Sequence, residues 1–269
     1  KAIEEYTAAI RIDSEHHIAY ISRGVAYERL GYHERAIEDY DEAIRLNPKF
    51  ALAYYNRGVA YSKLGQVDRA IEDYNKAIRV EPTFAQAFYN RGFAYHRLDR
   101  VEQAIQDFTE TIRLRPSFAS VYVNRGALYH RVGQSEQAIQ DLEEAIRLEP
   151  QLVEAFIARS AIYNDLGQYE QSIPDSDRVI QLAPRIAAGY SVRATAYAGL
   201  GKYERAIEDY DEAIRLNPTY PSAYHNRGIV YSELGQYKRG LEDIDKALGL
   251  DPNNDKYRES RKRVAELVP

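Results

Sequence analysis

One stretch of sequence recurs unchanged far along the chain, and its spacing defines the period of the other patterns. The segment from Glu34 to Pro48 recurs letter for letter from Glu204 to Pro218, an offset of 170 residues, or five periods of 34. Prolines keep the same register, at Pro48, Pro82, Pro116, Pro150, Pro184, Pro218 and Pro252. A fixed period of this length is typical of arrays in which each repeat packs on its neighbours.

The period divides the whole chain into repeats. Residues 1–16 form half a repeat, because Tyr6 matches Tyr40 one period later. Seven full repeats follow, at 17–50, 51–84, 85–118, 119–152, 153–186, 187–220 and 221–254. The last segment, 255–269, is expected to be a capping helix. We therefore predict one domain over 1–269, with no linker.

Each repeat is predicted to hold two helices joined by a short turn. Helical spacing of apolar residues runs from Ala51 to Leu64, breaks at Gly65, and resumes to Val80 before Pro82 stops it. Glycine takes positive φ without a Cβ clash, so a left-handed cap is expected where the first helix ends. That place holds Gly31, Gly65, Gly133, Gly167, Gly201 and Gly235, with Asp99 in the third full repeat.

The recurring residues carry a family resemblance. In repeat 51–84 they are Tyr54, Arg57, Gly58, Tyr61, Ala70, Tyr74, Ala77 and Pro82. This pattern resembles the tetratricopeptide repeat over the whole chain, with Tyr or Phe for the usual Trp and Arg for the usual Leu. The resemblance implies an all-α, right-handed α-superhelix, an α-solenoid of stacked antiparallel helix pairs. It also implies a concave groove, lined by the first helices, that binds a peptide segment or a helix of a partner.

The first helix of each repeat has a face that is free of the packing inside its own repeat. At 100° per residue, Tyr55, Val59 and Lys63 fall on this face, away from Gly58. The predicted peptide-binding groove consists of Tyr55, Asn56, Val59, Lys63, Tyr89, Asn90, Phe93, Arg97, Val123, Asn124, Arg131 and Asn226. Because basic residues border apolar ones in the first four repeats, we predict an acidic ligand with apolar anchors. The alternative is that the apolar residues pack neighbouring first helices and the charges form a solvated face.

Asparagines and small residues add two further patterns to this face. The asparagines that precede Arg-Gly resemble the ladder with which some tetratricopeptide superhelices grip a peptide backbone, since a carboxamide both donates and accepts. The alternative is that they bond neighbouring helices. In the last three full repeats the face is smaller, more polar and partly acidic, as Ser191, Thr195 and Gly199 illustrate.

Arginine and aspartate each occupy one place in every full repeat. The arginines are Arg23, Arg57, Arg91, Arg125, Arg159, Arg193 and Arg227. The aspartates are Asp39, Asp73, Asp107, Asp141, Asp175, Asp209 and Asp243. We predict that they pair between adjacent helices through charge-assisted hydrogen bonds. The alternative is a stripe of anion-binding arginines.

Composition narrows the class of function. The net charge is -5 with interspersed signs and there is no cysteine, so nucleic-acid binding and thiol chemistry are disfavoured. No apolar run approaches membrane length, so we expect a soluble chain without membrane insertion, with the cytoplasm as its compartment. No cofactor, metal or catalytic residue is predicted, because His96 and His130 stand too far apart to share a metal ion.

The sequence therefore predicts a non-enzymatic scaffold or adaptor that binds a partner protein or peptide. Two alternatives remain, a homo-oligomeric assembly module and the substrate-recruiting region of a larger enzyme with its catalytic domain upstream of Lys1. The half repeat leaves apolar residues uncovered, so we expect the N-terminal end to self-associate or to be covered by upstream residues.

Two irregular segments carry their own expectations. In the terminal helix, expected from Asp255 to about Leu267, the side formed by Tyr257, Val264 and Leu267 should cover the last repeat. In repeat 153–186, Pro174 is expected to delay the second helix or to remove one backbone hydrogen bond.

Overall fold

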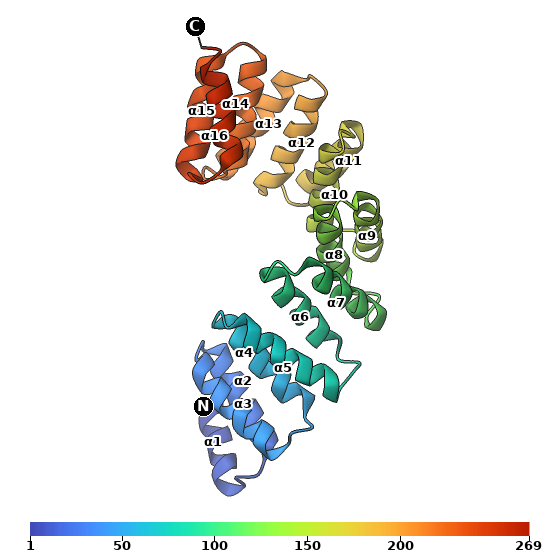
Figure 1. Cartoon of the computed structure of the whole chain (residues 1–269), viewed down its shortest axis with the longest axis vertical. Helices are drawn as coiled ribbons and strands as arrows, with labels where there is room; N and C mark the ends of the chain where they lie inside the picture. The colour runs from blue at the N-terminus through green and yellow to red at the C-terminus, as the bar shows by residue number, and fades with distance from the viewer. Residues whose placement is uncertain (269) are drawn as a thin grey trace. The chain divides into compact units, whose positions relative to one another are not determined.

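The computed structural model describes residues 1–268, which form sixteen α-helices and no strand. They group into two compact units: unit 1 is Lys1–Tyr129, and unit 2 begins at His130 (Figure 1). Unit 1 holds α1 (Ala2–Ile12), α2 (His17–Arg29), α3 (His33–Leu46), α4 (Ala51–Lys63), α5 (Val67–Val80), α6 (Ala85–Arg97), α7 (Val101–Leu114) and most of α8 (Ala119–Arg131). Unit 2 holds α9 (Ser135–Leu148), α10 (Val153–Asp165), α11 (Tyr169–Leu182), α12 (Ala187–Gly199), α13 (Tyr203–Leu216), α14 (Pro221–Glu233), α15 (Tyr237–Leu250) and α16 (Asp255–Ala265).

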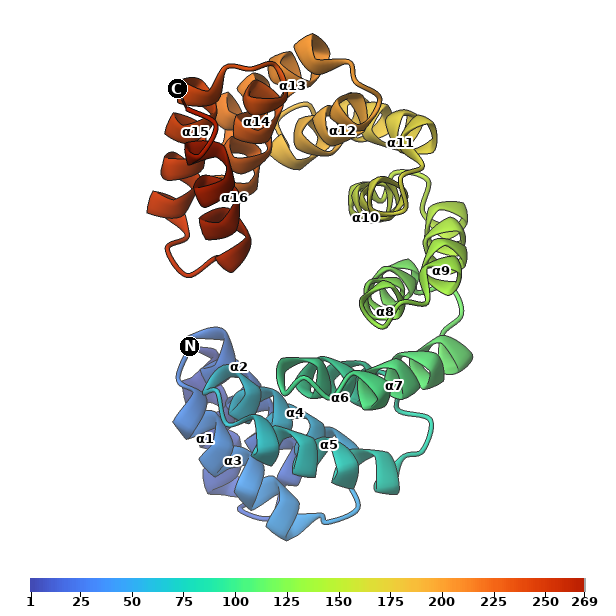
Figure 2. The same ribbon diagram turned by 45° about the horizontal axis from the view of Figure 1, so that its top comes forward.

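Helices pack in consecutive pairs within each unit. The first helices α2, α4 and α6 of unit 1 and α10, α12 and α14 of unit 2 each contact the second helix of their own repeat. First helices of neighbouring repeats also contact one another, α2 with α4 and α4 with α6 in unit 1, and α10, α12, α14 and α16 in series in unit 2 (Figure 2). The predicted all-α solenoid of helix pairs is confirmed within each unit. That a single domain runs through both units stays a prediction.

The turn inside each repeat has the predicted left-handed cap. At the end of α4, Gly65 has φ 76°, its N–H donates to Ser62 O, and the N–H of Gln66 donates to Tyr61 O. These two bonds satisfy carbonyl groups at the helix end that would otherwise lack partners. Asp99 takes the same conformation with φ 58°, which confirms its assignment to the glycine place.

Small residues let the paired helices approach closely. A Cβ atom on Gly58 would lie 2.8 Å from the Tyr74 ring and 3.2 Å from the Ala70 carbonyl oxygen. Both Ala70 and Ala77 are fully buried. A larger residue at Gly58 would therefore overpack the pair, at a cost of roughly 1–3 kcal/mol.

The repeat with Pro174 keeps a full second helix. α11 begins at Tyr169, so the expectation of a delayed helix is wrong, and Pro174 lies inside the helix. Proline has no N–H, so it removes one backbone hydrogen bond, as the other expectation had it. The core is also altered here, because Ser176 occupies the place of Tyr74 and donates its hydroxyl to Ser172 O at 3.0 Å.

The last helix is shorter than predicted. α16 ends at Ala265, and Tyr257, Ser260 and Val264 form its buried side. Leu267 is 50% exposed, so its predicted place on the covering face is wrong. The reason is that the helix stops before Leu267, which then no longer follows the helical register of Val264.

Candidate functional site

The arginine and aspartate columns are part of the scaffold. In repeat 51–84, Arg57 donates from Nε and Nη2 to the two carboxylate oxygens of Asp73, both at 2.7 Å, and from Nη1 to Asp41 of the preceding second helix. The same pairing, sixteen residues apart, joins Arg23 to Asp39, Arg91 to Asp107, Arg159 to Asp175, Arg193 to Asp209 and Arg227 to Asp243. The predicted pairing is confirmed for these six repeats.

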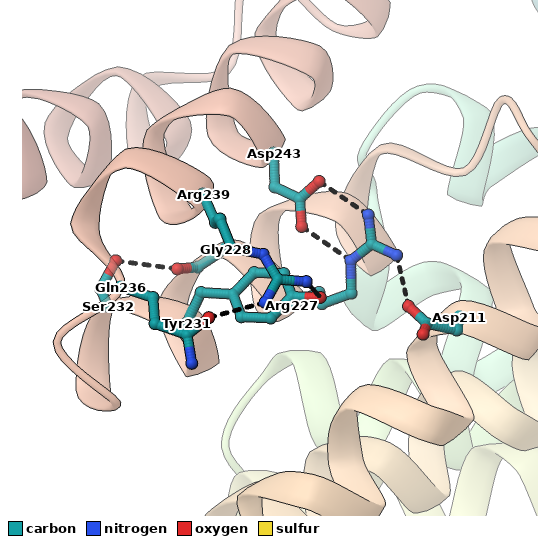
Figure 3. Close-up of polar contacts among 8 residues, drawn as sticks. All are labelled: Asp211, Arg227, Gly228, Tyr231, Ser232, Gln236, Arg239 and Asp243. Carbon is teal, nitrogen blue, oxygen red and sulfur yellow. Dashed lines mark hydrogen bonds and ion pairs between the residues drawn. The ribbon is translucent and has the colours of Figure 1, made fainter.

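Figure 3 shows one such arginine in unit 2. Arg227 lies between Asp243 of its own repeat and Asp211 of the preceding one. Burial lowers the pKa of Arg227, but the hydrogen bonds and charges of Asp243 and Asp211 together outweigh it and hold the pKa above its ordinary value. Beside it, the Arg239 guanidinium lies 4.0 Å from the centre of the Tyr231 ring and donates to its hydroxyl at 2.7 Å. Because carboxylates of the chain already occupy the Arg227 guanidinium, this column does not form an anion-binding stripe.

The first-helix face of unit 1 is tied together by side chains. Asn90 Nδ2 donates to the Tyr55 hydroxyl at 3.0 Å, and Asn124 Nδ2 donates to the Tyr89 hydroxyl at 3.3 Å. Each bond joins one first helix to the next, across 35 residues. The predicted groove residues Asn90 and Asn124 therefore use their amide donors inside the chain.

Aromatic rings fill the space between these helices. The Tyr89 ring centre lies 4.8 Å from that of Phe93 and 5.0 Å from that of Phe118, and the Tyr55 ring lies 4.9 Å from Phe84. Val59 and Val123 are half-buried on the same face. Lys63 and Arg97 are exposed, and Arg97 Nη1 donates to Ser62 O at 3.1 Å. Part of the predicted groove thus packs the first helices together.

A smaller groove lies in unit 1 among α1, α2 and α4. Its volume is about 540 Å³. Its lining is mostly apolar, with Ile21, Val25 and Leu52, and it includes Arg29 and the predicted residue Asn56.

A larger cavity lies in unit 2, along α10, α12, α14 and α16. Its volume is about 980 Å³, and Asn226 is the predicted groove residue that lines it. Small side chains make the space, because Ser191, Thr195 and Gly199 of α12 all line it. We call this space the unit 2 cavity. Arg131, the remaining predicted residue, is exposed at the end of α8.

A buried histidine joins the floor of the unit 2 cavity to α16. His225 is 3% exposed, and its ring stacks on Tyr257 with centres 4.6 Å apart. Its Nδ1 lies 3.0 Å from Asn226 Oδ1, and its Nε2 lies 2.9 Å from Ser260 Oγ. An amide oxygen only accepts, so Nδ1 carries the proton and the Ser260 hydroxyl donates to Nε2. Burial lowers the pKa of His225, and the nearby charges of Lys256 and Arg263 lower it further.

The rim of the unit 2 cavity carries charges of both signs. Lys256, Lys262 and Arg263 of α16 line it, together with Glu259 and Glu266. At the other end, Asp165 Oδ2 lies 3.0 Å from His130 Nε2. The cavity can therefore meet a ligand with polar groups on its floor and charged groups at its edges.

Sequence reasoning placed most groove residues in unit 1 and did not predict the unit 2 cavity. The signal was present in the repeat alignment. Where α6 has Tyr89 and Phe93, α12 has Ser191 and Thr195. The sequence showed that these residues are smaller, but side-chain size alone does not show whether neighbouring helices close over the space.

Residues 1–268 lack two further features that would indicate a function. They contain no cluster of three or more histidine, aspartate or glutamate side chains placed to hold a metal ion. None of the helices within 1–268 has the length and apolar character that crossing a membrane requires.

Profiles described as tetratricopeptide repeat match residues 51–84, 85–118, 119–152, 221–254 and 153–186. A further profile, described as TPR repeat, matches residues 30–65 and 194–235. The chain therefore belongs to the tetratricopeptide repeat family. No curated protein matches the chain.

Solved structures of the same fold are similar to the chain at low identity. A tetratricopeptide repeat protein from Parabacteroides merdae is 22% identical with a TM-score of 0.74, over 93% of this chain and 98% of that one. YrrB, described as a TPR protein with an unusual peptide-binding site, is 23% identical with a TM-score of 0.61, over 71% and 98%. The Cut9–Hcn1 hetero-tetramer of the APC/C is 16% identical with a TM-score of 0.71, over 97% of this chain and 52% of that one.

Proposed function

We propose that this chain is a non-catalytic interaction scaffold that holds an extended segment of a partner protein in the unit 2 cavity. The observation that carries the proposal is the hollow of about 980 Å³ that α10, α12, α14 and α16 leave between their side chains. Ligand sites of proteins have volumes of roughly 300–1,000 Å³ and a few placed polar groups.

The polar floor suits a peptide. Asn164, Ser191 and Asn226 line the unit 2 cavity and offer both donors and acceptors. A peptide backbone presents an N–H and a C=O at every residue, so it can match such a floor without a particular side chain. The peptide-binding site in the description of YrrB agrees with this use of the fold.

The same side chains give little support to catalysis. Both ring nitrogens of His225 already have hydrogen-bond partners within the chain, and the sequence has no cysteine. One of these partners is the Ser260 hydroxyl, but Ser260 is 9% exposed and His225 is 3% exposed, so little of either group is exposed to a substrate.

A random peptide library displayed on phage tests the proposal. We expect selection against the chain to yield peptides that lose binding when Thr195→Phe narrows the unit 2 cavity with the residue that α6 has at the same place. Thr83→Phe, in an exposed turn of unit 1, is the matched control and should leave binding unchanged. Selected peptides that bind both variants equally would contradict the proposal.

We propose in addition that the smaller groove of unit 1 receives an acidic segment with apolar anchors, as the sequence predicted. Arg29 borders the apolar residues of that groove, and Lys63 is exposed on the same face of the next first helix. Peptides that are selected against the whole chain and bind this groove should bind less tightly to the double variant Arg29→Glu with Lys63→Glu. The control variant Lys49→Glu, in an exposed turn, should have no effect on their binding.

Self-association through this apolar end is a further proposal, which sedimentation velocity over a range of concentrations would test.

A further inference from the structure

Four residues that line the unit 2 cavity have counterparts at the same repeat places in unit 1. There the counterparts surround the ring of Tyr89. The Tyr89 ring lies beside Phe93, Phe108 and Phe118, with ring centres 4.8, 6.0 and 5.0 Å away. Asn124 donates to its hydroxyl. Three periods of 34 later, the places of Phe93, Phe108, Phe118 and Asn124 are taken by Thr195, Tyr210, Tyr220 and Asn226. All four of these residues line the unit 2 cavity.

The ring that these walls would enclose is missing. The place of Tyr89 is taken by Ser191, which also lines the cavity. Its side chain is too short to reach across to α14, so the bond that Asn124 makes to Tyr89 has no equivalent at Asn226. The Asn226 amide lies beside the Tyr210 hydroxyl, as the Asn90 amide lies beside that of Tyr74, but it lacks the second phenol that Tyr55 supplies to Asn90.

The walls have also become more polar than those around Tyr89. Three phenylalanines are replaced by Thr195, Tyr210 and Tyr220, each of which carries a hydroxyl group. The Thr195 and Tyr210 hydroxyls lie 3.0 Å apart. Thr195 Oγ1 also donates to Ser191 O at 3.0 Å, so these hydroxyls form a small network, which an occupant with its own hydroxyl can join.

A second, independent observation indicates a ligand at the same cavity. Asn164 of α10 lines it and is 8% exposed. Its Nδ2 donates to Val192 O at 2.8 Å, but its Oδ1 is buried with no hydrogen-bond partner in residues 1–268. A buried acceptor without a donor is unfavourable, so a donor from outside the chain would relieve it.

We propose that the unit 2 cavity is a recognition pocket for a tyrosine of the partner segment. The phenol ring occupies the space above Ser191 that corresponds to the Tyr89 ring, and its oxygen accepts a hydrogen bond from the Asn226 amide. A backbone N–H of the same segment donates to Asn164 Oδ1. This inference rests on the proposed peptide-binding function and adds the side chain that the pocket selects.

The test uses N-acetyl-L-tyrosinamide as the probe and N-acetyl-L-phenylalaninamide as its matched control, titrated into the ¹⁵N-labelled chain. We expect the tyrosine probe to shift the side-chain amide signals of Asn226 and Asn164. The phenylalanine probe should bind about two- to tenfold more weakly, because it lacks one hydrogen bond, and should leave the Asn226 signals in place.

Two reciprocal variants test whether the tyrosine probe binds at this position. Ser191→Tyr supplies the ring from within, so it should abolish binding of the tyrosine probe and raise the melting temperature. Tyr89→Ser opens the same space in unit 1 and should create a second probe site beside Asn124, because a cavity opened in a core can take up an aromatic guest. If Ser191→Tyr fails to fold, Thr195→Phe narrows the same pocket and should also weaken the probe.

The outcomes separate this inference from the function on which it rests. Equal binding of the two probes, or binding that Ser191→Tyr leaves unchanged, would overturn the tyrosine pocket. If library peptides bind the unit 2 cavity but contain no required tyrosine, the pocket is refuted and the scaffold function stands. If neither peptides nor probes perturb the residues of the unit 2 cavity, both proposals fail.

Discussion

The first helices α6 and α12 occupy equal places in their repeats but present opposite surfaces. In unit 1, α6 fills its face with Tyr89, Phe93 and Arg97, and Tyr89 contacts three neighbouring rings. In unit 2, α12 has Ser191, Thr195 and Gly199 at those places, and a cavity lies over them. The size of the side chains at these places therefore decides whether the face packs against neighbouring rings or leaves a cavity.

What the two helices share is the other face. Arg91 of α6 and Arg193 of α12 each bond both carboxylate oxygens of an aspartate sixteen residues later. The pairing that joins first and second helices is thus kept where the first-helix face changes. The paired arginines and the proposed binding surface lie on separate sides of one helix, so their residues can vary independently.

The largest expected effect tests that shared side. Arg91→Ala in unit 1 and Arg193→Ala in unit 2 each leave a buried aspartate without its arginine, so each should lower the free energy of unfolding by about 3 kcal/mol. Chemical denaturation monitored by circular dichroism measures both. Arg45→Ala removes a solvent-exposed pair with Glu42 and should leave the unfolding midpoint unchanged. Loss in one unit alone would show that the columns are not equivalent.

A smaller effect on the free energy of unfolding should distinguish the face of α6 from that of α12. Tyr89→Ser removes a half-buried ring from among three others and should destabilise the chain by about 2 kcal/mol. Ser191→Ala, at the same repeat place in unit 2, should change the free energy of unfolding by less than about 0.5 kcal/mol. Equal losses from the two substitutions would mean that the face of α12 is as well packed as that of α6.

A pH dependence is expected in unit 2 through His225. Its folded-state pKa lies below the ordinary value of 6.5, so the unfolded chain takes up the proton first as the pH falls. The stability that neutral His225 contributes is therefore complete above pH 6.5 and is lost as the pH falls below it towards the folded-state pKa. Urea denaturation at a series of pH values should show this slope.

The variant His225→Tyr provides the control, because tyrosine is the residue that α4 and α6 have at this place. The slope between pH 5 and 7 should be shallower in this variant than in the natural chain. An unchanged slope would assign the pH dependence to other groups.

The smallest effect concerns the asparagines. Asn90→Ala removes the bond to the Tyr55 hydroxyl and should cost about 1 kcal/mol of stability. Asn226→Ala is compared in a His225→Tyr background, because that background removes the bond from His225 Nδ1 to Asn226 Oδ1. There it should cost less than Asn90→Ala, because the place of Tyr55 is taken by Ser191, which offers no phenol. A melting curve for each variant measures the difference, and a larger loss for Asn226 would contradict the idea that its donor is available to a ligand.

Much of the fold could be predicted from local signals. The positive φ of Gly65 and Asp99, the helix pairs and the pairing of Arg57 with Asp73 all follow from residues that recur every 34 positions. The end of α16 could not be predicted in the same way, because α16 follows the last full repeat and no later repeat exists with which its last residues could be compared. Leu267 was placed by extending a helix that stops at Ala265.

The candidate site was predicted only in part. The sequence identified the face of the first helices and the place of Asn226, and Asn226 lines the unit 2 cavity. The alternative that asparagines of this face bond neighbouring helices is confirmed for Asn90 and Asn124, but the sequence did not identify their tyrosine partners. Those bonds join residues from different repeats, and their partners depend on how neighbouring helices are packed.

By itself, the sequence determined the period, the two helices of each repeat, the turn glycines and the family. These features depend on spacings within one repeat, where helix periodicity and steric limits on φ act over a few residues. Only the tertiary structure decided where the chain is filled and where it is hollow. The unit 2 cavity is the space left over by side chains of α10, α12, α14 and α16, and leftover space is a property of several helices packed together.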